Sequence, residues 1–295
     1  MRIVVTGAGG FIGCRVVDRL VAGGHDVVAI GRGLVRTDCR VIDARFDACD
    51  WSRVGPVEGL LHLAAINDTT VRDEAELRRV NVEAAVGCME AAIEAGCSRV
   101  VYASSLHVYG PIAAPMSVAR STPAPVSPYG RSKLMLERAA AEVAARHGLP
   151  CIGLRLANVY GPGESHKGRM ASQVLQIARQ MREGDPEIFA PGTQVRDFVY
   201  VDDVVAALEA ATTASDPPMP AVLNCGSGAG TSFNDLIALL NATLGLHRAA
   251  RHVAQPPGYL ARVVLDIDAT RAALGWRPRP IQAGLAAYLA SGELR

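Results

Sequence analysis

A tyrosine and a lysine four positions apart are the first residues of this chain that could carry out chemistry together. Tyr129 and Lys133 lie in the segment YGRSK, and this spacing places both side chains on one face of a helix. A free phenol has a pKa of about 10, and a neighbouring positive charge favours its phenolate form. Tyr129 is therefore a candidate acid/base that exchanges a proton with a substrate hydroxyl.

A second candidate acid lies in the segment GPGESHKGRMAS, residues 161–172. Here His166 and Lys167 stand among glycines and small residues, without the apolar periodicity of a buried element. An enzyme that oxidises a secondary alcohol and then reduces the ketone on its other face must supply a proton from either side. One tyrosine does not easily serve both faces. Two interpretations of Lys167 stay open: a solvated loop charge, or the second acid.

The elements that must position these groups begin with a glycine-rich turn. The segment TGAGGFIG, residues 6–13, follows a short apolar run and opens an amphipathic one. Gly7 permits a tight turn, Gly10 lets the backbone approach a pyrophosphate, and Gly13 lets helix and strand pack closely. The N-terminus of the helix then faces the anion. We predict that this turn binds a dinucleotide.

The end of the second predicted strand bears on the choice between NAD and NADP. An acidic residue there would bind the 2′-hydroxyl of the adenosine ribose, but the segment AIGRGLVR places Gly31 at this position. Arg32 follows and Arg36 is near, and a guanidinium suits a 2′-phosphate. The sequence therefore favours NADP over NAD.

Short apolar runs alternate with helical patterns along the chain. The predicted strands are 2–5, 25–30, 39–42, 59–65, 99–105 and 151–157, and the predicted helices are 11–24, 74–95, 127–147, 170–182, 232–244 and 281–290. This alternation is typical of an α/β fold whose parallel sheet is covered on both faces. We predict a Rossmann-like, doubly wound domain over 1–158, to which 196–215 return. Residues 159–195 and 216–295 form a smaller, discontinuous C-terminal domain for the substrate, and the cleft between the two is the expected ligand site.

The composition excludes several classes of function. Of the 295 residues, 49% are hydrophobic, and the formal charge is +1. This balance argues against binding to nucleic acid or to a membrane surface. No apolar run reaches the roughly 18 residues of a membrane helix, and no signal-peptide pattern precedes the first strand. Seven cysteines are scattered and never spaced as CxxC, so we predict a cytoplasmic protein with reduced thiols and no metal site.

Beyond the glycine turn, six ordered motifs resemble the extended short-chain dehydrogenases, the NAD-dependent epimerase/dehydratase family. They are HLAA (62–65), NVEAA (81–85), YASSLHVYG (102–110), YGRSK (129–133), RLANVYGP (155–162) and RDFVYVDDV (196–204). The resemblance covers essentially the whole chain. It implies a cofactor site formed by Gly7, Gly10, Phe11, Ile12, Gly13, Arg32, Asp47, Ala48, Leu63, Ala64, Ala65, Asn81, Tyr129, Lys133 and Val159. Asp47 corresponds to an acidic residue of the adenine pocket.

The resemblance also implies how the catalytic group works. Lys133 would bind the nicotinamide ribose, Ser105 would hydrogen-bond the same substrate oxygen as Tyr129, and Asn81 would support the helix geometry. Relatives that dehydrate nucleotide sugars carry Asp and Glu directly after the position of Ser105, where this chain has leucine and histidine. Leucine neither donates nor accepts a proton, so a 4,6-dehydratase is not expected. His107 is either a substrate contact or a packed, hydrogen-bonded side chain.

The segment around Lys167 resembles one subgroup, the ADP-glycero-manno-heptose 6-epimerases. In that subgroup the lysine of a His-Lys-Gly motif is the second acid/base. The segments PEIFAPGTQVRDFVYVDDV and GYLARVVLD resemble it as well. The resemblance implies that a nucleotide-diphosphate sugar contacts Ser105, His107, Asn158, Lys167, Arg196 and Tyr259.

The expected activity is epimerisation of a nucleotide sugar through a transient ketone, with a tightly bound NADP or NAD that is not consumed. A net NADPH-dependent ketoreductase and a 4-epimerase stay open as alternatives. The segment PPGY, residues 256–259, disfavours the 4-epimerase. Sugar-nucleotide 4-epimerases have RPGD at this place, where the arginine binds a phosphate, and this chain has Pro256 instead. A catalytically silent dinucleotide sensor is disfavoured by Ser105, Tyr129 and Lys133. Relatives pair through the helices at 74–95 and 127–147, so a homodimer or higher homo-oligomer is expected.

Overall fold

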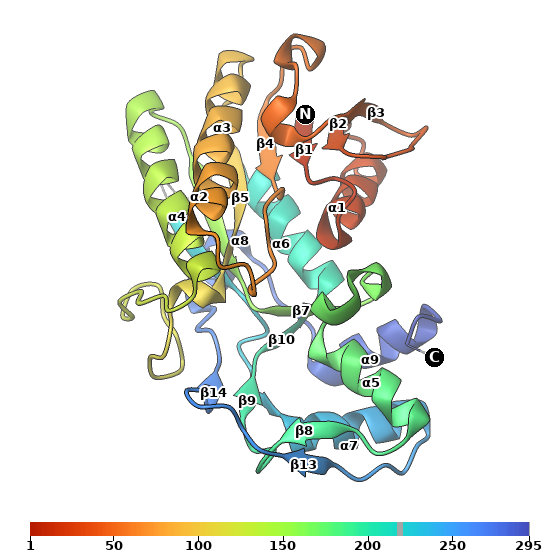
Figure 1. Cartoon of the computed structure of the whole chain (residues 1–295). Coiled ribbons are helices and arrows are strands. Elements are labelled where there is room, and N and C mark those ends of the chain that lie inside the picture. Colours follow the sequence, from red (N-terminus) through yellow and green to blue (C-terminus); the bar gives the residue numbers. More distant parts are fainter. Residues whose placement is uncertain (217–220, 295) are drawn as a thin grey trace.

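The main sheet of the computed structural model, which describes residues 1–216 and 221–294, has seven parallel strands. Their order is β11–β6–β5–β4–β1–β2–β3, and Figure 1 labels the part of this sheet from β5 to β3. The strands are β1 (Arg2–Thr6), β2 (Asp26–Gly31), β3 (Arg40–Asp43), β4 (Gly59–His62), β5 (Val100–Ser105), β6 (Cys151–Leu156) and β11 (Ala221–Cys225). The predicted Rossmann-like α/β fold is confirmed. The order reverses between β1 and β4, which is where such sheets bind ligands at their carboxyl edge.

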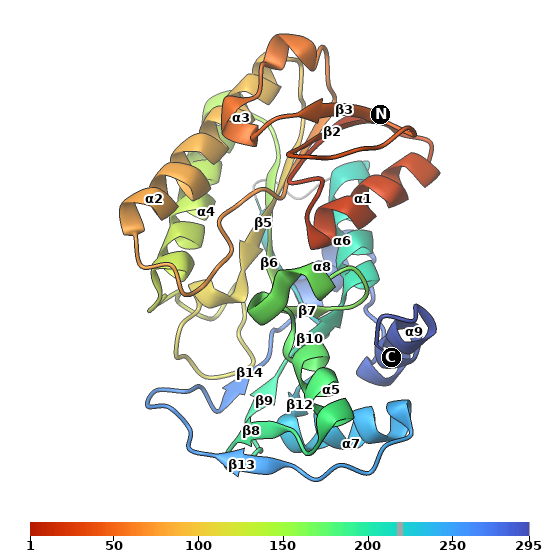
Figure 2. The same cartoon turned by 45° about the vertical axis from the view of Figure 1, so that its right-hand side comes forward.

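Alternation along each strand divides the apolar side chains between two cores. On β1, Ile3 and Val5 belong to one core and Val4 belongs to the other. Helices α1 (Phe11–Ala22) and α6 (Val201–Thr213) cover the first face, and α3 (Ala84–Glu94) and α4 (Pro128–His147) cover the second (Figure 2). Because both faces are covered, the polar residues that follow the strands meet at the edge of the sheet.

The single helix predicted over 74–95 is interrupted. Its first part, α2 (Glu74–Arg78), begins after Asp73, whose carboxylate accepts a hydrogen bond from the Glu76 amide at 3.0 Å. One π-helical turn, Arg79–Glu83, then separates α2 from α3. Such turns are frequent at functional sites, and this one carries Asn81.

Most of the remaining elements pack around a third apolar core, at one end of the molecule and below the main sheet in Figure 1. The helices of this part are α5 (Gln173–Glu183), α7 (Phe233–Leu244) and α9 (Ile281–Ala290), whereas α8 (Asp268–Leu274) lies against the first core. The strands are β7 (Asn158–Tyr160), β8 (Glu187–Phe189), β9 (Val195–Arg196), β10 (Phe198–Tyr200), β12 (Thr231–Ser232), β13 (Arg251–Val253) and β14 (Arg262–Val263). The sequence analysis missed these short strands because each is two or three residues long and shows no measurable alternation.

The division into two domains stays a prediction, but two elements lie differently from what it implies. The sequence analysis assigned 216–295 to the second domain, of which 217–220 and 295 lie outside the described residues. Within that range, β11 pairs in parallel with β6, and α8 packs against β11 and α6. We therefore propose that β11 and α8 belong to the cofactor-binding part. Within residues 1–216 and 221–294, no helix has the length and apolar character needed to cross a membrane.

Candidate active site

The glycine turn between β1 and α1 is shaped by close backbone packing. Gly7 has a φ of +69°, and a Cβ there would lie 2.8 Å from the amide nitrogen of Ala64. A Cβ on Gly13 would lie 2.1 Å from the carbonyl oxygen of Gly7. The Gly10 amide donates to that oxygen at 2.9 Å, and no side chain caps the first turn of α1. The uncapped amides can therefore receive the pyrophosphate of a dinucleotide.

A cavity of about 680 Å³ opens beside this turn, which is within the size range of small-ligand sites. Six of the residues expected to bind the cofactor line it: Gly7, Gly10, Arg32, Leu63, Ala64 and Ala65. The sequence analysis missed several others: Gly9, Ile30, Gly33, Ala44, Arg45, Phe46, Ile66, Asn67, Glu76 and Val80. Of the expected residues outside this lining, Phe11 and Gly13 are buried at the start of α1, Ile12 is half-buried beside them, and Val159 packs against the core.

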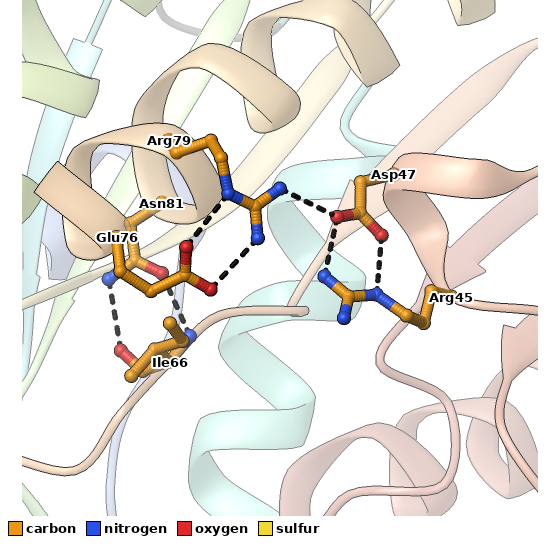
Figure 3. Close-up of polar contacts among 6 residues, drawn as sticks. All are labelled: Arg45, Asp47, Ile66, Glu76, Arg79 and Asn81. Carbon is orange, nitrogen blue, oxygen red and sulfur yellow. Dashed lines mark hydrogen bonds and ion pairs between the residues drawn. The ribbon is translucent and has the colours of Figure 1, made fainter.

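Asp47 and Ala48 do not line the cavity. They belong to the short turn Phe46–Ala48, in which Phe46 faces the cavity instead. The Asp47 carboxylate accepts hydrogen bonds from Nε and Nη2 of Arg45 at 2.9 and 2.6 Å, and from Arg79 at 3.4 Å (Figure 3). Arg45 thereby holds the pKa of Asp47 below its usual value. Arg79 also binds Glu76 through two hydrogen bonds of 2.8 Å. Asp47 therefore belongs to an ion-pair network with Arg45, Arg79 and Glu76 beside the cavity.

Arg32 is the exposed cation at the end of β2. Its neighbour Gly31 ends the strand, and both line the cavity. Arg32 makes no ion pair with the residues that the structure describes. Arg36, the other arginine considered for a 2′-phosphate, is bound to Asp18 at 2.7 Å and to Asp38 at 2.5 Å. Arg32 is therefore the better placed of the two for an anionic ligand.

Asn81 acts on the cavity through the backbone of the segment after β4. Its amide Nδ2 donates to the Ile66 carbonyl at 2.9 Å, and its Oδ1 accepts from the Ile66 amide at 2.8 Å (Figure 3). The same Nδ2 also donates to the Ser132 hydroxyl at 3.1 Å, and Ser132 donates to the Tyr129 carbonyl at 2.8 Å. Asn81 therefore links one wall of the cavity to the helix that carries Tyr129.

The start of α4 brings Tyr129 to the end of β5. Ser127 caps the helix by accepting from the Gly130 amide at 3.0 Å, and Pro128 occupies the first turn, which is a favourable start for a helix. A Cβ on Gly130 would lie only 2.5 Å from the His107 carbonyl oxygen. Glycine at this position lets the helix approach the turn after Ser105 closely. The Ser105 side chain is then near enough to the Tyr129 phenol to favour its ionised form.

Burial dominates the electrostatics of this group. It raises the pKa of Tyr129 to about 12, against the opposing effect of the nearby Ser105 side chain. It lowers the pKa of Lys133 to about 8, and the negative charge of Glu137 opposes this. The Lys133 ammonium lies 5.9 Å from the centre of the Tyr129 ring and donates to the Ala103 carbonyl at 2.9 Å. The chain alone thus keeps the phenol protonated, and a lower pKa requires a further positive charge near it.

The expected substrate contacts His107 and Asn158 lie on different elements, the short turn after β5 and strand β7. The His107 ring packs edge-on against Tyr129, with 5.8 Å between ring centres. The surrounding protein and the charge of Arg196 lower the pKa of His107, while the side chain remains accessible to solvent. The Asn158 amide donates to the Asp197 carbonyl at 2.9 Å, which ties β7 to the segment before β10. The His107 side chain is therefore available to a ligand. The side-chain amide of Asn158 already donates a hydrogen bond to the protein itself.

Lys167 lies in the short helical turn Ser165–Met170 and faces the protein. Its ammonium is 5.1 Å from the centre of the Phe11 ring at the start of α1. Burial lowers the pKa of Lys167, and the charge of Glu164 opposes this. The ammonium is therefore directed toward the helix that follows the glycine turn.

Arg196 packs against Tyr259, which lines a second, smaller cavity. The Arg196 side chain is 7% exposed, donates to the Val195 and Leu260 carbonyls at 2.8 Å each, and lies 4.5 Å from the centre of the Tyr259 ring. Tyr259 lines a cavity of about 250 Å³. Three glutamines and two phenylalanines that the sequence analysis missed line it as well: Gln173, Gln176, Gln180, Phe189 and Phe233. The Arg196 guanidinium therefore packs on the ring of Tyr259, and Tyr259 in turn lines the cavity.

A model of the NAD-dependent epimerase/dehydratase family matches residues 3–226. The ADP-L-glycero-D-manno-heptose-6-epimerase of Cupriavidus pinatubonensis is 36% identical over an alignment of 288 residues, and the match covers 90% of this chain and 83% of that protein.

Two solved structures superimpose over almost the full length. MoeE5 in complex with UDP-glucose and NAD has a TM-score of 0.87 and 33% identity, and the match covers 98% of both chains. The UDP-glucose 4-epimerase of Thermotoga maritima with UDP-glucose has a TM-score of 0.87 and 30% identity, again over 98% of both chains. The resemblance drawn from the motifs is confirmed.

Proposed function

Because this chain belongs to the NAD-dependent epimerase/dehydratase family, we propose that it is a nucleotide-sugar epimerase that inverts one carbon through a transient ketone. The observation that carries the proposal is the presence of two separate proton-transfer groups near the cofactor elements. Tyr129 lies beside Ser105, at the end of β5, and Lys167 lies over Phe11 at the start of α1. A one-way reductase needs only the first of these.

The residues divide the reaction into two proton transfers. When bound, the nicotinamide accepts a hydride from the sugar carbon and later returns it. Ser105 orients the sugar hydroxyl, and Tyr129 takes its proton as the ketone forms. Together with the positive charge of a bound oxidised nicotinamide, Lys133 would favour the phenolate. After the ketone has turned over, Lys167 supplies the proton to its oxygen as the carbon is reduced on the other face. The cofactor ends in its starting oxidation state.

The substrate of this proposal is an ADP-linked heptose or a similar nucleotide sugar. Support comes from the relative of Cupriavidus pinatubonensis and from the His-Lys-Gly segment around Lys167. A 4-epimerase acting on a UDP-sugar is the second candidate, favoured by the similarity to the Thermotoga maritima enzyme. Incubation with ADP-, UDP-, GDP- and dTDP-sugars, with product stereochemistry determined by NMR, distinguishes the two. Inversion at no carbon of any of these sugars would contradict the proposal.

The proposed cofactor preference is NADP, and it depends on Arg32. Arg32 lines the cavity without an ion pair to any residue that the structure describes, and Gly31 replaces the acidic residue that would bind a ribose hydroxyl. We expect Arg32→Ala to weaken NADP binding about tenfold or more, because one charge-assisted hydrogen bond is lost, and to leave NAD binding nearly unchanged. Titration of both cofactors by fluorescence measures this.

Arg36→Ala is the matched control, since Arg36 is bound to Asp18 and Asp38. It should not change the ratio of NADP to NAD affinity. A wild-type protein that binds NAD more tightly than NADP would show that Arg32 does not set the preference.

The proposed setting is the cytoplasm, and the proposed assembly is a homodimer. All seven cysteines are free thiols, which fits a reducing compartment. The helices α2, α3 and α4 lie together on one side of the sheet (Figure 2), where Arg131 of α4 bonds Glu74 of α2 at 2.5 Å. Pairing through these helices predicts twice the monomer mass in sedimentation.

A further inference from the structure

The segment that carries Lys167 is closed by one buried carboxylate. Glu164 has 0% of its surface exposed. Its Oε1 accepts hydrogen bonds from the Gly161 amide at 3.1 Å and from the Ser172 hydroxyl at 2.7 Å, and its Oε2 accepts from the Ser172 amide. The Tyr288 hydroxyl of α9 also donates to Oε1, at 3.3 Å. Because Gly161 and Ser172 begin and end the segment, one side chain joins its two ends.

The path from Glu164 to the Lys167 side chain is short. The Lys167 amide donates to the Glu164 carbonyl at 3.0 Å, which forms the turn between them. Gly168 follows with a φ of +54°, a conformation that glycine adopts without strain. The turn directs the Lys167 ammonium onto the Phe11 ring, 5.1 Å from its centre. The position of the ammonium is therefore set by a turn whose ends Glu164 holds together.

A second carboxylate contacts the same segment from outside. Glu293, which follows α9, is exposed and accepts hydrogen bonds from the Gly163 amide at 2.7 Å and from the Ser165 hydroxyl at 3.4 Å. It binds the segment through groups before Lys167 and does not join its ends. The two glutamates therefore provide a matched pair, one buried inside the turn and one on its surface.

We propose that Glu164 is a positioning residue for Lys167 and that it determines how much product forms by proton delivery from Lys167. The inference rests on the proposed function, in which Lys167 is the second proton donor. Glu164 acts through the geometry of the 161–172 segment. Its negative charge also opposes the lowering of the Lys167 pKa that burial causes, so it favours the protonated, donating form.

Glu164→Gln disturbs this arrangement with little change in size. Oε1 faces the Gly161 amide and Oε2 faces the Ser172 amide. Whichever way the new amide is turned, its NH₂ group meets a backbone N–H, and one hydrogen bond becomes a repulsive contact. The variant therefore opens one end of the segment and removes the charge beside Lys167.

The test measures which epimer forms from the ketone. The probe is the keto form of whichever ADP-, UDP-, GDP- or dTDP-sugar is inverted in the incubation above, supplied with reduced cofactor. Hydride goes to the carbonyl carbon, and the proton on its oxygen comes from Tyr129 for one epimer and from Lys167 for the other. The ratio of epimers, determined by NMR, separates the two donors, whereas a general loss of folded protein lowers both epimers equally.

We expect the wild type to form both epimers and Lys167→Met to form only the epimer assigned to Tyr129. Glu164→Gln should reduce the share of the other epimer at least about tenfold, since small displacements of reacting groups carry large rate penalties. Glu164→Asp keeps the charge on a shorter side chain and should restore part of this share. Glu293→Gln should leave the ratio as in the wild type.

Each outcome decides between the inference and the function on which it rests. If Lys167→Met leaves the ratio unchanged, or no sugar is inverted, the proposed function fails and the inference fails with it. If Lys167→Met changes the ratio but Glu164→Gln does not, only the inference is overturned. It is also overturned if Glu164→Gln and Glu293→Gln lower both epimers in equal proportion. Should Glu164→Gln not fold, Glu164→Asp must still shift the ratio in the same direction, and an unchanged ratio overturns the inference.

Discussion

Tyr129→Phe is expected to lower kcat by about 100-fold to 10,000-fold, the usual effect of removing a general acid/base. The Tyr129 phenol lies beside Ser105, and burial raises its pKa to about 12. No proton leaves the sugar hydroxyl readily without a group placed to receive it. Phenylalanine keeps the ring, so its packing against His107 at 5.8 Å is retained. Initial rates of epimer formation measure the effect.

Cofactor affinity serves as the internal control for this variant. The cavity of about 680 Å³ is lined by residues of the glycine turn and of the strand ends, without Tyr129, so NADP or NAD should bind with nearly wild-type affinity. Tyr102→Phe is a matched control, because Tyr102 is a tyrosine of β5 buried in the apolar core, and it should leave kcat unchanged. Wild-type kcat in Tyr129→Phe would contradict the assignment of Tyr129.

Lys167→Met is expected to lower the rate of inversion by about 100-fold or more, while oxidation of the sugar continues. Methionine keeps an unbranched apolar side chain that can pack on Phe11 but has no proton to donate. Reduction then returns mainly the starting epimer, through Tyr129. The initial rate at which the inverted epimer forms, followed by NMR, measures the effect.

The adjacent turn supplies a control for the loss of charge. Arg169 lies in the same short helical turn, with its side chain 78% exposed and 3.6 Å from Asp68. Arg169→Met removes a positive charge without removing a group that faces Phe11, so its inversion rate should match the wild type. Equal losses in both variants would mean that the charge of the turn, and not Lys167 itself, supports the reaction.

The sequence predicted features whose cause is local. Gly7 and Gly13 could be identified because a turn with positive φ and a helix packed on a strand each demand glycine within a few residues. Tyr129 and Lys133 share a helix face by spacing alone. The alternating apolar runs gave the sheet and its covering helices. These inferences need no knowledge of how distant segments meet.

Features that depend on distant segments could not be predicted in the same way. Arg45 binds Asp47, and Arg79 joins them from a helix that follows β4, so the residue expected at the adenine was found in an ion-pair network. Arg36 is bound by Asp18 of α1. Glu164 meets Tyr288 only because α9 packs beside the 161–172 segment. In each case the partner of a charged group is set by tertiary packing, which leaves no spacing pattern in the sequence.

The most direct test of the central claim uses a substrate that carries deuterium at the carbon to be inverted. The wild-type enzyme is given this nucleotide sugar with its bound cofactor and no other reductant. We predict that the product has the opposite configuration at that carbon, keeps the deuterium there, and forms over many turnovers without consumption of NADPH or NADH. Loss of the deuterium to water, or product formation only as added NADPH is consumed, would contradict a mechanism of transient oxidation and re-reduction.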